Sequence, residues 1–139
     1  DNYIAGRSMG GYGTIKFALT QSQLFSKAAM LSAVFDVSMI GQYEWYDFSP
    51  QSVVGDANHI AGTQFDPYYL VEQVVDQHKD LPQLYIKCGT EDELYQGNID
   101  FIQFLNLKEV PYHFKESTGV HDYAYWDKAI KEVIEEFTA

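Results

Sequence analysis

Hydrophobic residues along the 139-residue chain gather in short apolar runs that are separated by longer segments of mixed polarity. A short apolar run bounded by turn-forming residues is typical of a buried β-strand. Pro111 opens the last of these runs, which favours an edge position because proline cannot donate a hydrogen bond to a neighbouring strand. The pattern predicts four strands, at residues 3–5, 27–32, 83–88 and 111–116.

The segments between these runs carry the spacing of amphipathic helices. Asp66 followed by Pro67 is a helix start, and Asn98 is expected to cap the following helix. Residues 34–65 lack a clean period and are expected to form a long loop with one short helix. The pattern predicts helices at 11–19, 66–77, 98–108 and 122–137, with apolar faces that include Ile15, Ala18 and Leu19; Leu70, Val71, Val74 and Val75; Ile99, Phe101, Ile102, Phe104 and Leu105; and Trp126, Ile130, Val133, Ile134 and Phe137.

Strands and helices therefore alternate along the whole chain. This order predicts an α/β fold in a single domain over residues 1–139, with about four parallel strands and helices on both faces. Reaction sites in such sheets lie at the carboxyl ends of the strands. The polar residues that directly follow the strands are therefore the first candidates for a functional site.

Composition narrows the range of partners. With 20 acidic and 9 basic residues, the net charge of −11 repels phosphate backbones and anionic headgroups, so we expect neither nucleic acid nor a membrane as partner. The lone cysteine, Cys88, lies in a predicted strand, where we expect a buried, inert thiol, and its isolation favours a cytoplasmic location. The four histidines are scattered without metal-site spacing, so no metal or other cofactor is expected.

A serine, an acid and a histidine each follow a different predicted strand. Ser8 follows the first strand, Asp92 the third and His121 the fourth. A serine hydroxyl needs a base to accept its proton, histidine can be that base, and a buried carboxylate orients the imidazole. The order serine, aspartate, histidine is that of the α/β-hydrolases. These residues are therefore the candidate catalytic triad.

The residues around Ser8 fit a nucleophile on a sharp turn between a strand and a helix. In Gly6-Arg7-Ser8-Met9-Gly10 the two glycines are expected to remove collisions across the turn, and Gly11 and Gly13 to let the next helix approach the sheet. The backbone N–H of Met9, at the start of that helix, is expected to point at an oxyanion.

Other residues compete for the same roles. For the base, His121 competes with His59, His78 and His113, but only His121 directly follows a strand. For the acid, Asp92 competes with its neighbours Glu91 and Glu93 and with Asp36, while Asp122 fits better as an acid in the first turn of a helix. The aromatic side chains of Tyr12, Tyr95, Tyr123 and Trp126 are expected in the core or at the rim, where one of them could line a substrate pocket.

Three segments together resemble the esterase D group of α/β-hydrolases, and within it the tributyrin esterases. They are IAGRSMGGYG, LPQLYIKCGTEDELYQGN and STGVHDYAYWDKAI. That group also includes S-formylglutathione hydrolases and feruloyl or acetyl-xylan esterases. The resemblance implies that Ser8 is the nucleophile, Asp92 the triad acid, His121 the base and the Met9 N–H one oxyanion donor. It also implies a serine carboxylesterase that acts on small acyl esters without a cofactor.

The chain departs from the family pattern in two residues and in length. Arg7 stands where the family often has an apolar residue or histidine and could tune access, and Tyr123 stands where tryptophan is common. Family members carry a further stretch before the nucleophile strand, roughly as long again, with the early strands and the second oxyanion donor. We therefore expect this chain to be the carboxyl-terminal part of a larger esterase. We also expect this part to have little activity by itself. Its first strand would be an exposed edge through which copies could associate.

The triad leaves the acyl acceptor open. S-formylglutathione hydrolases, acyltransferases and peptidases on the same scaffold form the same acyl-enzyme. The alternative outside the enzymes is a non-catalytic fragment, in which the turn at Ser8 is kept only because the fold requires it.

Overall fold

The computed structural model describes residues 1–37, 49–56 and 59–139, which form one parallel sheet covered by helices. The four predicted strands are present, and the sheet order β1-β2-β3-β4 puts the first and last at its edges. The predicted short helix within residues 34–65 is present as α2, and part of that region, residues 38–48 and 57–58, lies outside the described residues. The strands are β1 (Tyr3–Arg7), β2 (Lys27–Leu31), β3 (Gln83–Gly89) and β4 (His113–Ser117), and the helices are α1 (Met9–Thr20), the 3₁₀ helix η1 (Ser22–Leu24), α2 (Pro50–Val54), α3 (Pro67–Asp76), α4 (Tyr95–Leu107) and α5 (Tyr123–Thr138).

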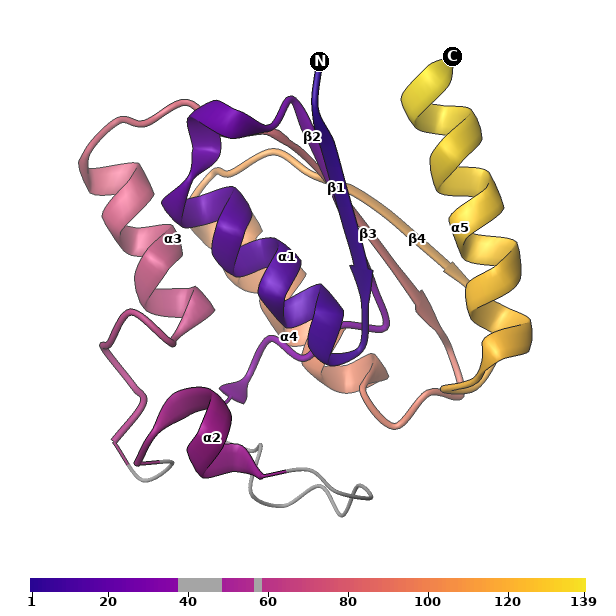
Figure 1. Cartoon of the computed structure of the whole chain (residues 1–139), viewed down its shortest axis with the longest axis horizontal. Coiled ribbons are helices and arrows are strands. Elements are labelled where there is room, and N and C mark those ends of the chain that lie inside the picture. The colour runs from indigo at the N-terminus through magenta and orange to yellow at the C-terminus, as the bar shows by residue number, and fades with distance from the viewer. Residues whose placement is uncertain (38–48, 57–58) are drawn as a thin grey trace.

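Helices cover both faces of the sheet, as predicted (Figure 1). Side chains alternate along β2, so that Ala28 and Met30 pack in the core shared with α1, α3 and α4, whereas Ala29 and Leu31 pack against α5. A parallel strand buried on both faces is apolar at nearly every position, which explains the continuous run in the sequence. Among the described residues, no helix is long and apolar enough to cross a bilayer.

Helix α4 begins earlier than the sequence predicts. Asn98 was expected to cap this helix, but it lies inside it with no exposed surface, and its amide Nδ2 donates to the carbonyls of Ala33 and Leu94. The chain instead turns at Asp92, whose Oδ1 accepts the N–H of Leu94 at 2.8 Å. The carboxylate of Asp92 therefore organises the turn that starts the helix.

The ends of α1 and α5 also differ in detail from the prediction. Helix α1 begins directly after Ser8, at Met9, rather than at Gly11. Asp122 is the N-cap of α5, where its side chain accepts the N–H of Tyr125. Ile134 was placed on the apolar face of α5 but is 56% exposed, whereas Trp126, Val133 and Phe137 are buried as expected.

Backbone and side-chain hydrogen bonds join the loops that leave β3 and β4. The Thr90 N–H donates to the Ser117 carbonyl, and the Glu91 N–H donates to the Gly119 carbonyl, both at 3.0 Å. In return, the Gly119 N–H donates to the Glu91 carboxylate at 3.0 Å. Glu91 thus fixes the loop that leads to His121 against the turn that carries Asp92.

The pairing of Glu91 with Gly119 predicts a pH-dependent contribution to stability. The Gly119 N–H, followed by the Thr90 hydroxyl, lowers the pKa of the Glu91 carboxyl from its ordinary 4.5. A carboxyl whose pKa is lower in the folded state stabilises the fold above its ordinary pKa, and this contribution is lost as the pH falls through the folded pKa. We expect Glu91→Gln to lower the melting temperature at pH 7, and the difference from the unchanged protein to shrink below pH about 4.5. Differential scanning calorimetry from pH 3.5 to 7.5 measures this, with the exposed neighbour Glu93→Gln as the control; a difference that does not vary with pH would contradict the assignment.

Cys88 is predicted to stay unreactive in the folded protein. Its side chain has no exposed surface, and burial, followed by the negative charge of Asp92, raises the pKa of its thiol to about 12. Because the thiolate is the reactive form, we expect no alkylation by iodoacetamide at pH 8 in the native state and complete alkylation in urea. Intact-mass spectrometry distinguishes the two, and modification of the folded protein would show that this part of the core opens.

Candidate active site

Ser8 lies on a sharp turn between β1 and α1, in a backbone conformation that residues other than glycine rarely adopt. Its φ of 54° and ψ of −121° are strained for a residue other than glycine. Hydrogen bonds hold this conformation from both sides: the Ser8 N–H donates to the Leu31 carbonyl at 2.9 Å, and the Ser8 carbonyl accepts from Gly11, Tyr12 and Val34. The turn is therefore fixed by both the helix that follows it and the neighbouring strand.

The glycines around Ser8 do not all serve the expected purpose. A Cβ on Gly6 would collide with the Gly10 carbonyl and the Thr14 hydroxyl, and a Cβ on Gly11 would collide with Ala33. Gly6 and Gly11 are therefore required by close packing, as expected. The expectation was wrong for Gly10 and Gly13, because a Cβ at either position would meet no described atom within 4 Å.

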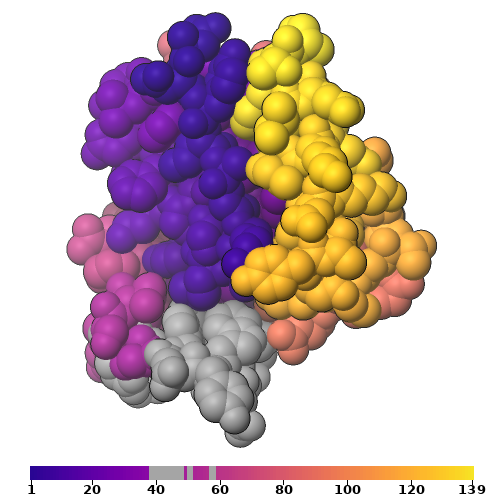
Figure 2. Space-filling model, turned by 45° about the vertical axis from the view of Figure 1, so that its right-hand side comes forward, coloured from indigo at the N-terminus to yellow at the C-terminus, as the bar shows by residue number. Residues whose placement is uncertain are grey.

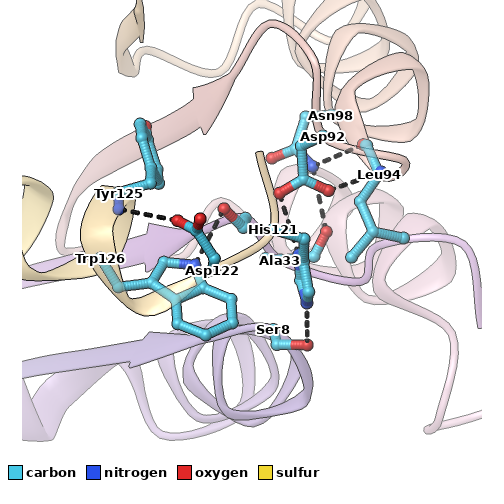
Figure 3. A network of polar contacts seen from close by, with 10 residues as sticks. Ser8, Ala33, Asp92, Leu94, Asn98, His121, Asp122, Tyr125 and Trp126 are labelled. Atoms are coloured by element: carbon cyan, nitrogen blue, oxygen red, sulfur yellow. Dashed lines mark hydrogen bonds and ion pairs between the residues drawn. The ribbon is translucent and has the colours of Figure 1, made fainter. Parts of the chain in front are cut away.

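The structure brings together the three residues of the predicted triad (Figure 3). The Ser8 hydroxyl lies 2.9 Å from Nε2 of His121, and Nδ1 of His121 lies 2.9 Å from Oδ2 of Asp92. Because the carboxylate accepts the proton on Nδ1, Nε2 of the neutral imidazole is left to accept the proton of the Ser8 hydroxyl. The arrangement can therefore activate the serine.

Burial differs between Asp92 and His121 in the way that this chemistry needs. The Asp92 side chain is fully buried, and its two oxygens accept from the Leu94 N–H and from His121. The His121 side chain is 18% exposed. A buried carboxylate can orient and stabilise an imidazolium, whereas the partly open imidazole can exchange protons with a substrate.

The competing residues lie elsewhere. His59 is exposed and pairs with Asp56, His113 is exposed on β4 and stacks on Tyr85, and His78 follows the end of α3. Among the competing acids, Glu91 binds Gly119, Asp122 caps α5, and Glu93 and Asp36 are exposed.

The Met9 N–H remains a predicted oxyanion donor, and its place at the start of α1 fits that role. Met9 is the first residue of α1, so its N–H has no acceptor within the helix and lies at the positive end of the helix dipole. It directly follows Ser8 in the sequence. The described residues hold no group of three or more histidine, cysteine, aspartate or glutamate side chains that could bind a metal ion.

The four aromatic candidates divide between the core and the more exposed rim. Tyr12 is buried and donates to the Phe65 carbonyl, and the Tyr95 hydroxyl binds Glu116. Trp126 is buried with its ring against His121 at 4.8 Å between centroids, and Tyr123 is 67% exposed.

Asn98 and Glu91 have supporting roles that the sequence does not reveal. Asn98 ties α4 to the loop after β2 through the Ala33 carbonyl, and the neighbouring Val34 N–H in turn reaches Ser8. No local signal could have shown this, because an asparagine before an apolar segment is also the ordinary sign of a helix cap.

Comparisons with known proteins agree with this geometry. The family described as "Putative esterase" matches residues 1–137. An acetyl esterase of Caldicellulosiruptor saccharolyticus is 30% identical over an alignment of 141 positions, which covers 96% of this chain and 53% of that protein.

Two solved structures from Staphylococcus aureus superpose over the whole chain. One is FphF, a fluorophosphonate-binding serine hydrolase, with 52% identity and a TM-score of 0.95, and the other is the S-formylglutathione hydrolase FrmB, with 52% identity and a TM-score of 0.93. In both cases the match covers 100% of this chain and 55% of the other, so the chain spans about half the length of these relatives. A serine on a strained turn, its histidine and buried aspartate, and the match over residues 1–137 lead to one conclusion: the chain belongs to the esterase family of α/β-hydrolases.

Proposed function

We propose that the protein to which this chain belongs is a serine carboxylesterase that hydrolyses small acyl esters. The observation that carries the proposal is the continuous hydrogen-bonded path from the Ser8 hydroxyl through His121 to the buried carboxylate of Asp92. The match to the esterase family and the similarity to an acetyl esterase support it.

In the proposed first half-reaction, the oxygen of Ser8 attacks the ester carbonyl. The hydroxyl proton passes to Nε2 of His121 as the bond to the acyl carbon forms, and the carbonyl oxygen gains a negative charge beside the Met9 N–H. Asp92 stabilises the imidazolium. His121 then gives its proton to the departing alcohol, and the acyl group stays on Ser8.

In the second half-reaction, water takes the place of the alcohol. Its proton passes to His121 as its oxygen bonds to the acyl carbon, and the proton returns to Ser8 as the acid leaves. Sites of this kind take a second oxyanion donor from a loop that precedes the nucleophile. Removal of one such donor costs about 10²- to 10³-fold in turnover, so we expect full activity only from the full-length protein.

A thioesterase is the second candidate function, and the 52% identity to the S-formylglutathione hydrolase FrmB favours it. The triad chemistry is the same for both substrates, because a thiolate leaves in place of an alcohol. Hydrolysis of S-formylglutathione with a higher kcat/KM than that of any short-chain nitrophenyl ester would select this candidate.

Replacement of Ser8 by alanine tests the nucleophile. In the full-length protein we expect Ser8→Ala to lower kcat for nitrophenyl acetate and butyrate by at least about 10³-fold and to abolish labelling by a fluorophosphonate probe, because no other group takes the place of the hydroxyl. Ser26→Ala serves as the control and should retain activity, because Ser26 is exposed just before β2, at the end of the parallel sheet opposite to the one that carries the triad. Equal rates for Ser8→Ala and the unchanged protein would refute the proposal.

Replacement of Asp92 by asparagine tests the orientation of the histidine. The amide can turn its NH₂ toward His121 and favour the wrong tautomer, so we expect kcat to fall by about 10⁴-fold with little change in KM. Circular dichroism shows whether the fold is retained. A loss of less than about tenfold would mean that another acid supports His121.

A further inference from the structure

Ser8 and His121 are brought together from opposite edges of the described sheet. Ser8 follows β1 and His121 follows β4, with β2 and β3 between them. The sheet alone therefore does not set the distance between the two side chains. His121 lies just before the first turn of α5, and this helix packs on β2 through Ala29 and Leu31. A contact between the start of α5 and β1 would add a direct link between the segments that carry the histidine and the serine.

Arg7 makes this contact. It is the last residue of β1 and directly precedes Ser8. Its guanidinium carbon lies 4.7 Å from the ring centroid of Tyr123 and 4.3 Å from that of Trp126, and its Nη2 donates to the Tyr123 hydroxyl at 3.0 Å. Both rings belong to the first turn of α5. Figure 2 shows the N-terminal segment and α5 side by side, and Arg7 lines the groove of about 310 Å³ between β1 and this helix.

Trp126 connects this stack to the histidine. Its ring meets that of His121 edge to face, at 4.8 Å between centroids and an interplanar angle of 87°. Its indole N–H donates at 3.1 Å to the Ser32 hydroxyl, which is fully buried just after β2. Trp126 is thus held by the sheet on one side and by Arg7 on another, and in turn limits the movement of the His121 ring.

We propose that Arg7 is a positioning residue, which through Trp126 and Tyr123 holds His121 at hydrogen-bonding distance from Ser8. The inference rests on the proposed function of the triad and adds a residue that does not touch the reacting atoms. The planar guanidinium suits this role because it can stack on a ring and donate to a hydroxyl at once, whereas a lysine offers only a compact charge.

A second cation provides a matched control at the other end of α5. Lys27 lies 5.4 Å from the ring centroid of Tyr3 on β1 and 5.7 Å from that of Phe137 on α5, and its Nζ donates to the Phe137 carbonyl. Lys27 therefore joins the same two elements by the same kind of interaction. It lies at the end of α5 away from His121, so its loss should affect stability without affecting the triad.

The experiment compares Arg7→Leu, Arg7→Lys and Lys27→Leu in the full-length protein, with Ser8→Ala as the inactive reference. Steady-state hydrolysis of nitrophenyl butyrate gives kcat and KM, titration with a fluorophosphonate gives the concentration of competent sites, and thermal unfolding gives stability. We expect Arg7→Leu to lower kcat by about 10- to 100-fold with KM changed less than twofold, because small displacements of a catalytic group are costly. Arg7→Lys should have a higher kcat than Arg7→Leu. Lys27→Leu should keep kcat within twofold of the unchanged protein, even where its melting temperature falls as far as that of Arg7→Leu.

The outcomes separate this inference from the proposed function. If the unchanged protein hydrolyses no ester and its Ser8 does not react with the probe, the proposed function itself fails. If the unchanged protein is active, the inference is overturned by an Arg7→Leu kcat within twofold of normal, by an effect on KM alone, or by an equal fall in kcat for Lys27→Leu. The last result would show that general loosening of α5 is responsible.

Discussion

The strained backbone of Ser8 is the constraint on which the rest of the site depends. A φ of 54° costs free energy for any residue with a side chain, so it persists only where neighbouring groups enforce it. The carbonyl of Leu31 on β2 accepts the Ser8 N–H, and three N–H groups from α1 and the loop after β2 donate to the Ser8 carbonyl. The pairing of β1 with β2 and the close approach of α1 at Gly6 and Gly11 therefore raise the hydroxyl above the end of the sheet.

Three separate ties then bring the loops of the other strands to this hydroxyl. Glu91 joins the turn after β3 to the loop after β4 through Gly119, and Asn98 joins α4 to the loop after β2. Arg7 joins β1 to the start of α5. Each tie connects segments that are far apart in the sequence. Together they limit how far Asp92 and His121 can move relative to Ser8, which matters because catalysis is sensitive to displacements of about 1 Å.

The two faces of the sheet are covered by helices through different kinds of contact. The face covered by α1, α3 and α4 holds the larger apolar core, and a second apolar cluster that includes Tyr12, Val34 and Leu94 lies beside the turns at Ser8 and Asp92. The other face holds α5, where buried Lys87 on β3 pairs with Glu132 and Glu136 in addition to the apolar contacts. Ion pairs and contacts between aromatic rings depend on direction, whereas aliphatic packing does not. These contacts therefore limit how far α5 can slide along the sheet.

Sequence pattern alone is enough to predict the four strands, their parallel order and the meeting of Ser8, Asp92 and His121 at one edge of the sheet. Apolar runs report burial, and side chains that directly follow parallel strands must meet at one edge, so local pattern and order along the chain were enough. Only the tertiary structure decided the rest: that α4 begins at Tyr95 with Asn98 buried inside it, that Ile134 faces outward, that Gly6 and Gly11 rather than Gly10 are required by packing, and that Arg7 reaches across to α5. Most of these features depend on contacts with other segments, from Ala33 beside Gly11 and Asn98 to Tyr123 beside Arg7. A pattern of apolar and polar residues over a few neighbouring positions carries no information about such contacts.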